Sequence, residues 1–144
     1  MRSTLRRLRT WTPADYAALV ETLVLAGVVE LALASLPLAA IIRLHERVGT
    51  GRRSMPIDAV RSARLARFAA APYRALGWRG TCLRESLVLG SLLRRRGLPA
   101  RVCFGVDRRG SGLAAHAWVA VDKTPVSEGA PRFHELSGVR AWSA

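Results

Sequence analysis

The stretch from Thr81 to Asp122 constrains the fold more than any other part of this sequence. It opens with the apolar run CLRESLVLGSLLRRR over residues 82–96, which a glycine and a proline then bring to an end. Two alternating apolar runs follow, at 100–106 and 116–122, separated by the glycine-containing turn 107–112. This order predicts a core helix packed on a small antiparallel sheet, and therefore an α+β domain.

The chain before this stretch is expected to be helical. Residues 12–15, Thr-Pro-Ala-Asp, read as a helix start, with Thr as N-cap and Pro in the first turn. The helix should break at 35–37, and a second helix should run over 38–49. A third is expected over 56–76, ended or kinked by Pro72.

The sequence divides into two segments, which we expect to form one compact domain. Residues 1–55 form a helical N-terminal segment able to associate with a membrane or a partner, and 56–144 form the core. A short strand is predicted over 125–128, and the chain from Gly129 onward is predicted to be irregular.

The apolar run over residues 17–42 raises the question of a membrane. Its length approaches the ~20 residues of a membrane span. However, Glu30 would lie within the hydrocarbon and Pro37 interrupts the run. A buried or membrane-surface helical hairpin is favoured over a span, and peripheral membrane contact stays open.

Charge and cysteine content limit the partners and the compartment. The net charge is +13, yet of the 23 basic residues only Lys123 is a lysine, which also fits a genome rich in arginine codons. No basic stripe is interleaved with aromatic residues, so nucleic acid is not an expected partner. Two cysteines and no recognisable secretory signal favour a reducing cytoplasm.

Cys82 and His116 are the candidate catalytic residues. Cys82 stands at a helix start, capped by Thr81, where free backbone N–H groups and the helix dipole favour the thiolate. Ser86 and Gly90 lie on its helix face and leave room for a strand that carries His116. Taken singly, each of the two would be read as a buried structural residue, as we read Cys103, which lies in the middle of a predicted strand.

A metal site is the competing chemistry. The available ligands are Cys82, Cys103, His45, His116 and His134, and none shows the paired spacing of a zinc site. A dinucleotide fingerprint and a phosphate-binding loop are also missing from the sequence. No metal and no organic cofactor are therefore expected.

The run WRGTCLRESLVLGSLLRRRGLPARVCFGV, followed by AHAWVAVD, resembles the transglutaminase-like cysteine peptidases of lasso-peptide biosynthesis. These are the stand-alone leader-peptidase halves of the lasso B protein. The resemblance is close over 78–122 and looser over the helical N-terminal half. It implies a papain/transglutaminase-like fold and an endopeptidase that removes the leader from a ribosomally made precursor peptide. The implied partners are this precursor, a separate leader-recognition protein and a lasso cyclase.

By the same resemblance Cys82 would be the nucleophile, His116 the general base, and an acid the third member. Asp122 lies about 20 Å along the strand from His116. If a three-residue loop makes Val121 pair with Pro125, Glu128 falls on the face of His116. Glu128 is therefore preferred to Asp122, which stays an alternative.

Two other functions remain open. The same thiol can serve a transglutaminase-like acyltransferase, in which an amine takes the place of water. Alternatively, the apolar stretch 17–42 and the basic surface suit a non-catalytic, membrane-associated scaffold.

Overall fold

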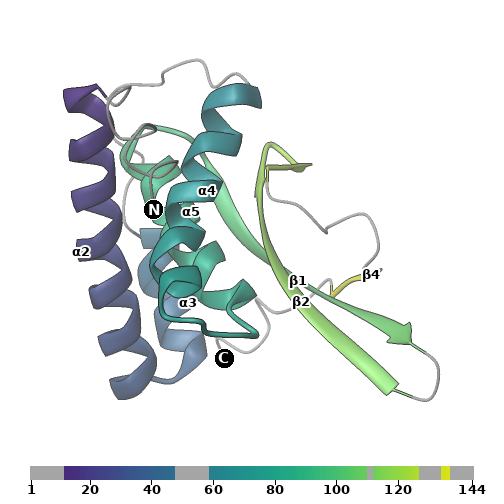
Figure 1. Ribbon diagram of the computed structural model, residues 1–144. Coiled ribbons are helices and arrows are strands. Elements are labelled where there is room, and N and C mark those ends of the chain that lie inside the picture. The colour runs from purple at the N-terminus through teal and green to yellow at the C-terminus, as the bar shows by residue number, and fades with distance from the viewer. Residues whose placement is uncertain (1–11, 48–58, 110–111, 127–133, 137–144) are drawn as a thin grey trace.

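The computed structural model describes residues 12–47, 59–109, 112–126 and 134–136. Within these residues four helices are followed by a small antiparallel sheet (Figure 1). The helices are α2 (Pro13–Ser35), α3 (Leu38–Arg47), α4 (Ala59–Ala75) and α5 (Cys82–Arg95). The strands are β1 (Ala100–Arg109), β2 (Gly112–Val121), β3 (Thr124–Pro125) and β4 (His134–Glu135). The predicted α+β class is confirmed.

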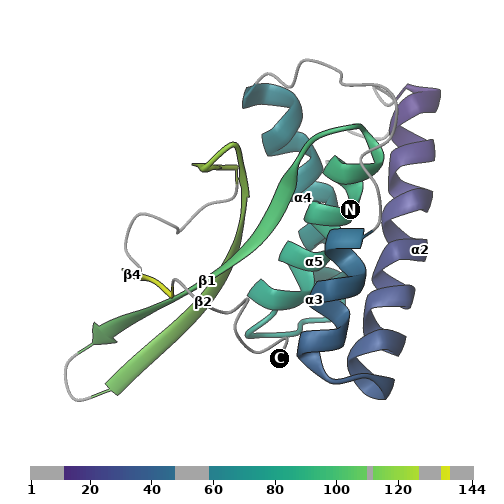
Figure 2. The same ribbon diagram turned by 180° about the vertical axis from the view of Figure 1, so that it is seen from behind.

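Helix α5 lies at the centre of the molecule. In both views it is enclosed between α2 and α3 on one side and α4 with the sheet on the other (Figures 1 and 2). Its middle carries some of the most deeply buried side chains of the chain, namely Leu87, Val88, Leu89, Leu92 and Leu93. These pack against Tyr73, Ala69 and Leu65 of α4, Val29 and Ala26 of α2, and Ala100 and Val119 of the sheet. The apolar run at 82–96 therefore forms the core of the domain.

The sheet has the strand order β3-β2-β1-β4. β1 and β2 form a long hairpin whose far end extends beyond the helices (Figure 1). Strand alternation gives β2 two different faces. Val119 packs in the main core with α5, whereas Trp118 and Ala120 form a second cluster with Cys103.

Helix α2 is attached to the body by its charged side chains. Its three acidic residues are each ion-paired with arginines of the other helices. The pairs are Asp15–Arg64 at 2.6 Å, Glu21–Arg95 at 2.6 Å, Glu21–Arg96 at 2.9 Å and Glu30–Arg84 at 2.8 Å. Two of the three arginines at the end of α5 thus bind α2, and Arg94 donates to the backbone carbonyl of Ala100 at 3.1 Å.

The predicted start of α2 and the predicted break after it are confirmed. Thr12 and Asp15 form a capping box, Pro13 occupies the first turn, and the helix ends at Ser35. The expectation for Pro72 is wrong in part, because α4 continues through it to Ala75. A proline removes one backbone hydrogen bond, and Leu76 still donates to the Pro72 carbonyl at 3.2 Å.

The sheet departs from the prediction in length and register. Both hairpin strands are longer than expected, since the polar residues that were assigned to the turn continue the ladder as far as Arg109 and Gly112. The predicted pairing of Val121 with Pro125 is wrong. Val121 pairs with Thr124 across a two-residue turn, and both turn residues, Asp122 and Lys123, have positive φ. Strand β4 was not predicted, and the expected segment boundary at residue 55 lies outside the described residues.

One helix in the described part of the chain, α2, is long and apolar enough to cross a membrane, with a mean hydropathy of 2.0. Only 17% of that stretch is buried inside the protein. Two of the ion pairs, those of Glu21 and Glu30, tie the same stretch to α5. A span would have to take these carboxylates into hydrocarbon, so this packing favours a helix held on the surface of the domain.

Candidate active site

A tight turn between α4 and α5 places Cys82 at the first position of α5. The turn needs two residues with positive φ, and both are glycines, Gly77 at +67° and Gly80 at +65°. The Trp78 amide donates to the carbonyl of Tyr73 at 3.0 Å, and the guanidinium of Arg84 lies 5.4 Å from the Trp78 ring centre. The residues of the motif WRGTC therefore hold the turn that leads into α5 in one conformation.

Thr81 precedes the helix but does not cap it with its side chain. Its hydroxyl instead donates to the carboxylate of Glu85 at 2.6 Å, while the Glu85 amide donates to the Thr81 carbonyl at 2.8 Å. The predicted hydroxyl cap is thus wrong. Because the Thr81 hydroxyl does not accept from them, the first backbone N–H groups of α5, which lie beside the Cys82 side chain, can donate to another acceptor.

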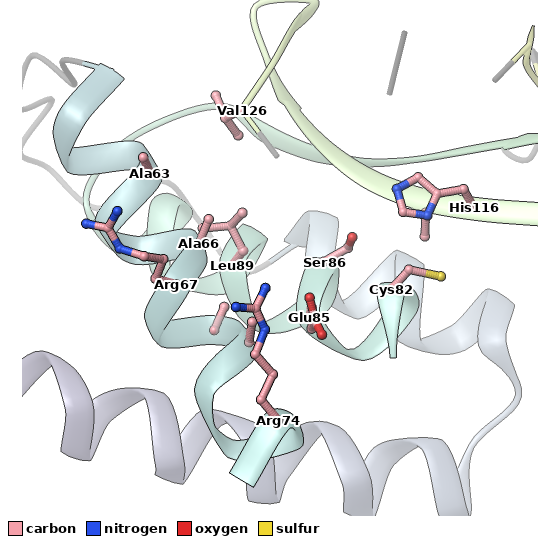
Figure 3. A pocket seen from close by; sticks show the side chains of 13 residues that line it. Ala63, Ala66, Arg67, Arg74, Cys82, Glu85, Ser86, Leu89, His116 and Val126 are labelled. Carbon is pink, nitrogen blue, oxygen red and sulfur yellow. The ribbon is translucent and has the colours of Figure 1, made fainter. Parts of the chain in front are cut away.

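A cavity of about 330 Å³ opens at this end of α5 (Figure 3). Cys82 and His116 both line it, the cysteine from the helix and the histidine from β2. Figure 3 shows the imidazole above the first turn of α5. The remaining wall comes from Glu85, Ser86 and Leu89 of α5, Ala117 and Val126 beside the sheet, and Ala63, Ala66, Arg67, Ala69, Ala70 and Arg74 of α4.

His116 is positioned by the second apolar cluster of the sheet. Its ring stacks on Trp118 at 6.3 Å between ring centres, as expected for two residues on one face of a strand. The Trp118 ring passes over Gly105, where an added Cβ would lie 2.8 Å from ring atoms. On the other edge of β2, β3 pairs with Ala120 and Val121.

The two cysteines differ in environment. Cys82 is partly exposed at the cavity, whereas Cys103 is buried in β1 opposite Trp118. Burial, with the nearby Glu135 carboxylate, raises the pKa of Cys103 to about 11. Cys103 is thus a neutral thiol at physiological pH, in accord with the structural role expected for it.

The candidate third residues are not equally placed. Asp122 is exposed in the β2–β3 turn, six residues along the chain from His116 in the middle of β2, and is not part of the cavity wall. Glu128 lies outside the described residues, and the register from which it was predicted is not the one observed. Glu135, which the sequence did not indicate, flanks Gly105 across the sheet from His116. Its carboxylate is close to Cys103, and the Trp118 ring covers Gly105 between it and the histidine.

The expected role of Gly90 is also wrong. The residue that approaches it is His45 of α3, whose Nε2 would lie 2.7 Å from an added Cβ. Ser86, by contrast, does line the cavity with Cys82. The small residues on this face of α5 therefore serve two different neighbours, a helix at Gly90 and the cavity at Ser86.

Sequence reasoning missed three charged residues of the cavity wall, Arg67, Arg74 and Glu85. The two arginines are seven residues apart on α4, or about 10 Å along the helix. Four alanines of α4 line the cavity with them, so this part of the wall is made of short side chains. The small residues at helical spacing around Arg67 were a signal in the sequence for this wall. However, the sequence alone does not show which face of α4 lies against α5 and the sheet.

Among the described residues no group of three or more His, Cys, Asp or Glu side chains is gathered closely enough to hold a metal ion.

Comparison with known proteins defines the class. Residues 23–138 match the transglutaminase-like superfamily, and the chain therefore belongs to it. Members of this superfamily are often cysteine-dependent enzymes, acting as peptidases or acyltransferases. No curated protein and no solved structure matched the chain. The match covers α5, the hairpin and most of α2, so the transglutaminase-like fold predicted for the cysteine helix and its sheet is confirmed.

Proposed function

We propose that this protein is a cysteine endopeptidase that removes the leader from the precursor of a lasso peptide. The observation that carries the proposal is the meeting of Cys82 and His116 at one cavity, at the start of α5, in a transglutaminase-like domain. The lasso role rests on the resemblance of the sequence over 78–122 to stand-alone lasso leader peptidases. The proposed location is the cytoplasm, where the precursor is made.

In the proposed reaction the Cys82 sulfur attacks the scissile carbonyl of the precursor. His116 takes the thiol proton and returns it to the leaving amine, which is the new N-terminus of the core peptide. Water then hydrolyses the acyl-enzyme and releases the leader with a free carboxylate. The first N–H groups of α5 are placed to hold the oxyanion of the tetrahedral intermediate, since the Thr81 hydroxyl does not occupy them.

For the third residue we propose Glu128 in preference to Asp122. Two observations support this choice. Asp122 lies in the β2–β3 turn, six residues along the chain from His116, and does not line the cavity. Val126, directly after β3, donates its amide to the Val119 carbonyl of β2 at 2.9 Å, and it lines the cavity two residues before Glu128.

The cavity suits an extended peptide. Its α4 wall consists of alanine side chains with the guanidinium groups of Arg67 and Arg74, so it offers a shallow surface with positive charge. The proposed partners are the precursor peptide, a separate protein that presents the leader, and the cyclase that uses the freed amine.

The test is to incubate the protein with candidate precursor and recognition protein and to follow the products by mass spectrometry. Cys82→Ala should abolish cleavage while circular dichroism stays unchanged. Cys103→Ala is the matched control, because it removes the other thiol and should retain most of the activity. Full cleavage by Cys82→Ala would falsify the proposal and favour the non-catalytic, membrane-associated scaffold instead.

The products also separate the peptidase from an acyltransferase. A leader with a free C-terminal carboxylate indicates that water resolves the acyl-enzyme, whereas an amide adduct with a supplied amine indicates acyl transfer. Glu128→Ala and Asp122→Ala, assayed together, assign the third residue. Loss of activity in Asp122→Ala alone would reverse our choice.

A further inference from the structure

Helix α2 is oriented with its charged side inward. Asp15, Glu21 and Glu30 are its only charged residues, and all three are paired with arginines of α4 or α5. An ordinary surface helix buries an apolar stripe and turns its charges to water. In α2 the carboxylates are used for attachment, and apolar side chains are left on the outside.

The outer face of α2 is a continuous apolar stripe. Ten positions at helical spacing are exposed, and none is charged: Tyr16, Ala17, Val20, Leu23, Val24, Gly27, Val28, Leu31, Ala34 and Ser35. The large side chains among them are 47–69% exposed. Isolated apolar residues are normal on a protein surface, but a stripe running the length of a 23-residue helix marks a contact surface.

The charges around the stripe identify its occupant. Four arginines, at positions 2, 6, 7 and 9, precede α2 with no acidic residue before Asp15. Beyond the other end of α2, α3 exposes two basic residues, Arg43 and Arg47, together with Leu44 and one acidic residue, Glu46. An uncharged apolar face on a chain of net charge +13 is complementary to a membrane whose lipids are anionic, because basic residues attract the headgroups while the apolar side chains enter the acyl boundary.

Two other occupants fit less well. A second copy of the chain would bring two surfaces of formal charge +13 together, which electrostatic repulsion opposes. In both views α2 is a single helix at the edge of the molecule (Figures 1 and 2), so its outer residues belong to one helix and not to a pair of elements that could hold a partner helix between them.

We propose that the protein binds anionic membrane surfaces through α2, which lies parallel to the bilayer plane. In this orientation α4, α5 and the cavity face the aqueous side, since α2 runs on the side of these helices away from the cavity (Figure 3). This proposal is independent of the peptidase function.

The experiment is sedimentation of the full-length protein with vesicles of phosphatidylcholine alone or with phosphatidylglycerol added. Wild-type protein should bind the anionic vesicles and should bind the neutral ones at least about tenfold more weakly. It should dissociate from the anionic vesicles as the salt concentration is raised. The variant Val24→Asp/Leu31→Asp should lose about tenfold or more of the binding to anionic vesicles. Leu113→Asp, on the exposed far part of β2, is the matched control and should bind as wild type does.

The proposal is overturned if wild-type protein stays in solution with anionic vesicles, or if it binds neutral vesicles equally well. It is also overturned if the α2 variant binds unchanged. A dimer in solution that the same variant dissociates would assign the stripe to a second copy. The milder Val24→Ser/Leu31→Ser protein replaces the aspartate variant if thermal melting shows that the latter does not fold.

Discussion

Helices α2 and α5 are both strongly apolar, yet the protein treats them in opposite ways. In α5 four of the five leucines and Val88 are almost fully buried, and the charged residues cluster at the two ends. In α2 the buried positions are few, and six of the large apolar side chains are 47–69% exposed. Apolar content alone therefore does not decide which helix becomes the core. In α2 the ion pairs that its acidic residues make with arginines of the other helices determine which side of the helix faces the protein.

The sharpest test of this contrast is truncation of one apolar side chain in each helix. Leu92→Ala in α5 removes a fully buried side chain and should lower the free energy of unfolding by about 2–5 kcal/mol. Val24→Ala in α2 removes an exposed side chain and should change it by about 0.5 kcal/mol or less. Urea unfolding measures the free energy of unfolding of both variants. Similar losses of stability in the two would show that α2 and α5 do not differ in burial as described.

The next effect concerns His45, which packs on α5 through Gly90. Burial, with the nearby positive charge of Arg94, lowers the pKa of His45 to about 4, below its ordinary value of 6.5. The unfolded chain therefore binds a proton in this range that the folded protein does not, and stability falls as the pH drops from 6.5 to 4. The loss should reach about 3 kcal/mol.

Urea unfolding at pH 7, 5.5 and 4 measures this loss. His45→Asn is the reference protein because it cannot take up this proton, so its stability should decline less between pH 6.5 and 4. Equal pH slopes in the two proteins would show that His45 is not buried as a neutral group.

Glycine-to-alanine changes give a smaller and opposite pair of effects. In α2 an added Cβ at Gly27 meets nothing within 4 Å, so Gly27→Ala should stabilise the helix by about 0.5–1 kcal/mol. In α5 the Cβ of Gly90→Ala would meet the His45 ring at 2.7 Å, and overpacking should destabilise the protein by about 1–3 kcal/mol. Thermal melts of both variants check the signs, and stabilisation by Gly90→Ala would contradict the packing described for α3.

The smallest expected effect concerns the ion pairs. Glu21→Gln weakens the contacts with Arg95 and Arg96, which are partly exposed, so the loss should be about 1 kcal/mol or less and should shrink in high salt. Leu23→Ala, an uncharged change at an exposed position of α2, is the control, and its effect on stability should not depend on the salt concentration. A loss in Glu21→Gln that does not depend on salt would mean that the carboxylate acts through packing.

The sequence was informative where local signals decide the structure. The Thr12-Pro13 start of α2 and the glycine stop of α5 were predictable because caps and breakers act within a few residues. The two cavity residues Cys82 and His116 followed from a helix start and a strand in the expected order. The role of Cys103 could be predicted because it lies mid-strand.

Features that depend on distant partners were not predictable. Nothing near Glu21 in the sequence indicates arginines 74 and 75 residues away. A helix that is apolar on both sides gives no periodic signal to say which side faces the core. The Asp122-Lys123 turn carries no Asn-Gly or Asp-Gly signature, so its two-residue length, and the register that depends on it, were missed.

The ion pairs between α2 and α5 have a consequence for insertions and deletions. Glu30 pairs with Arg84 near the start of α5, and Glu21 pairs with Arg95 near its end, so the two helices lie antiparallel. The two ion pairs fix the position of α2 along α5 at two points. One residue added between Glu21 and Glu30 would rotate one glutamate by about 100° relative to the other and shift it by 1.5 Å. Both contacts cannot then form together. The spacing of nine residues between these glutamates is thus fixed by α5, although neither glutamate lies in the cavity wall.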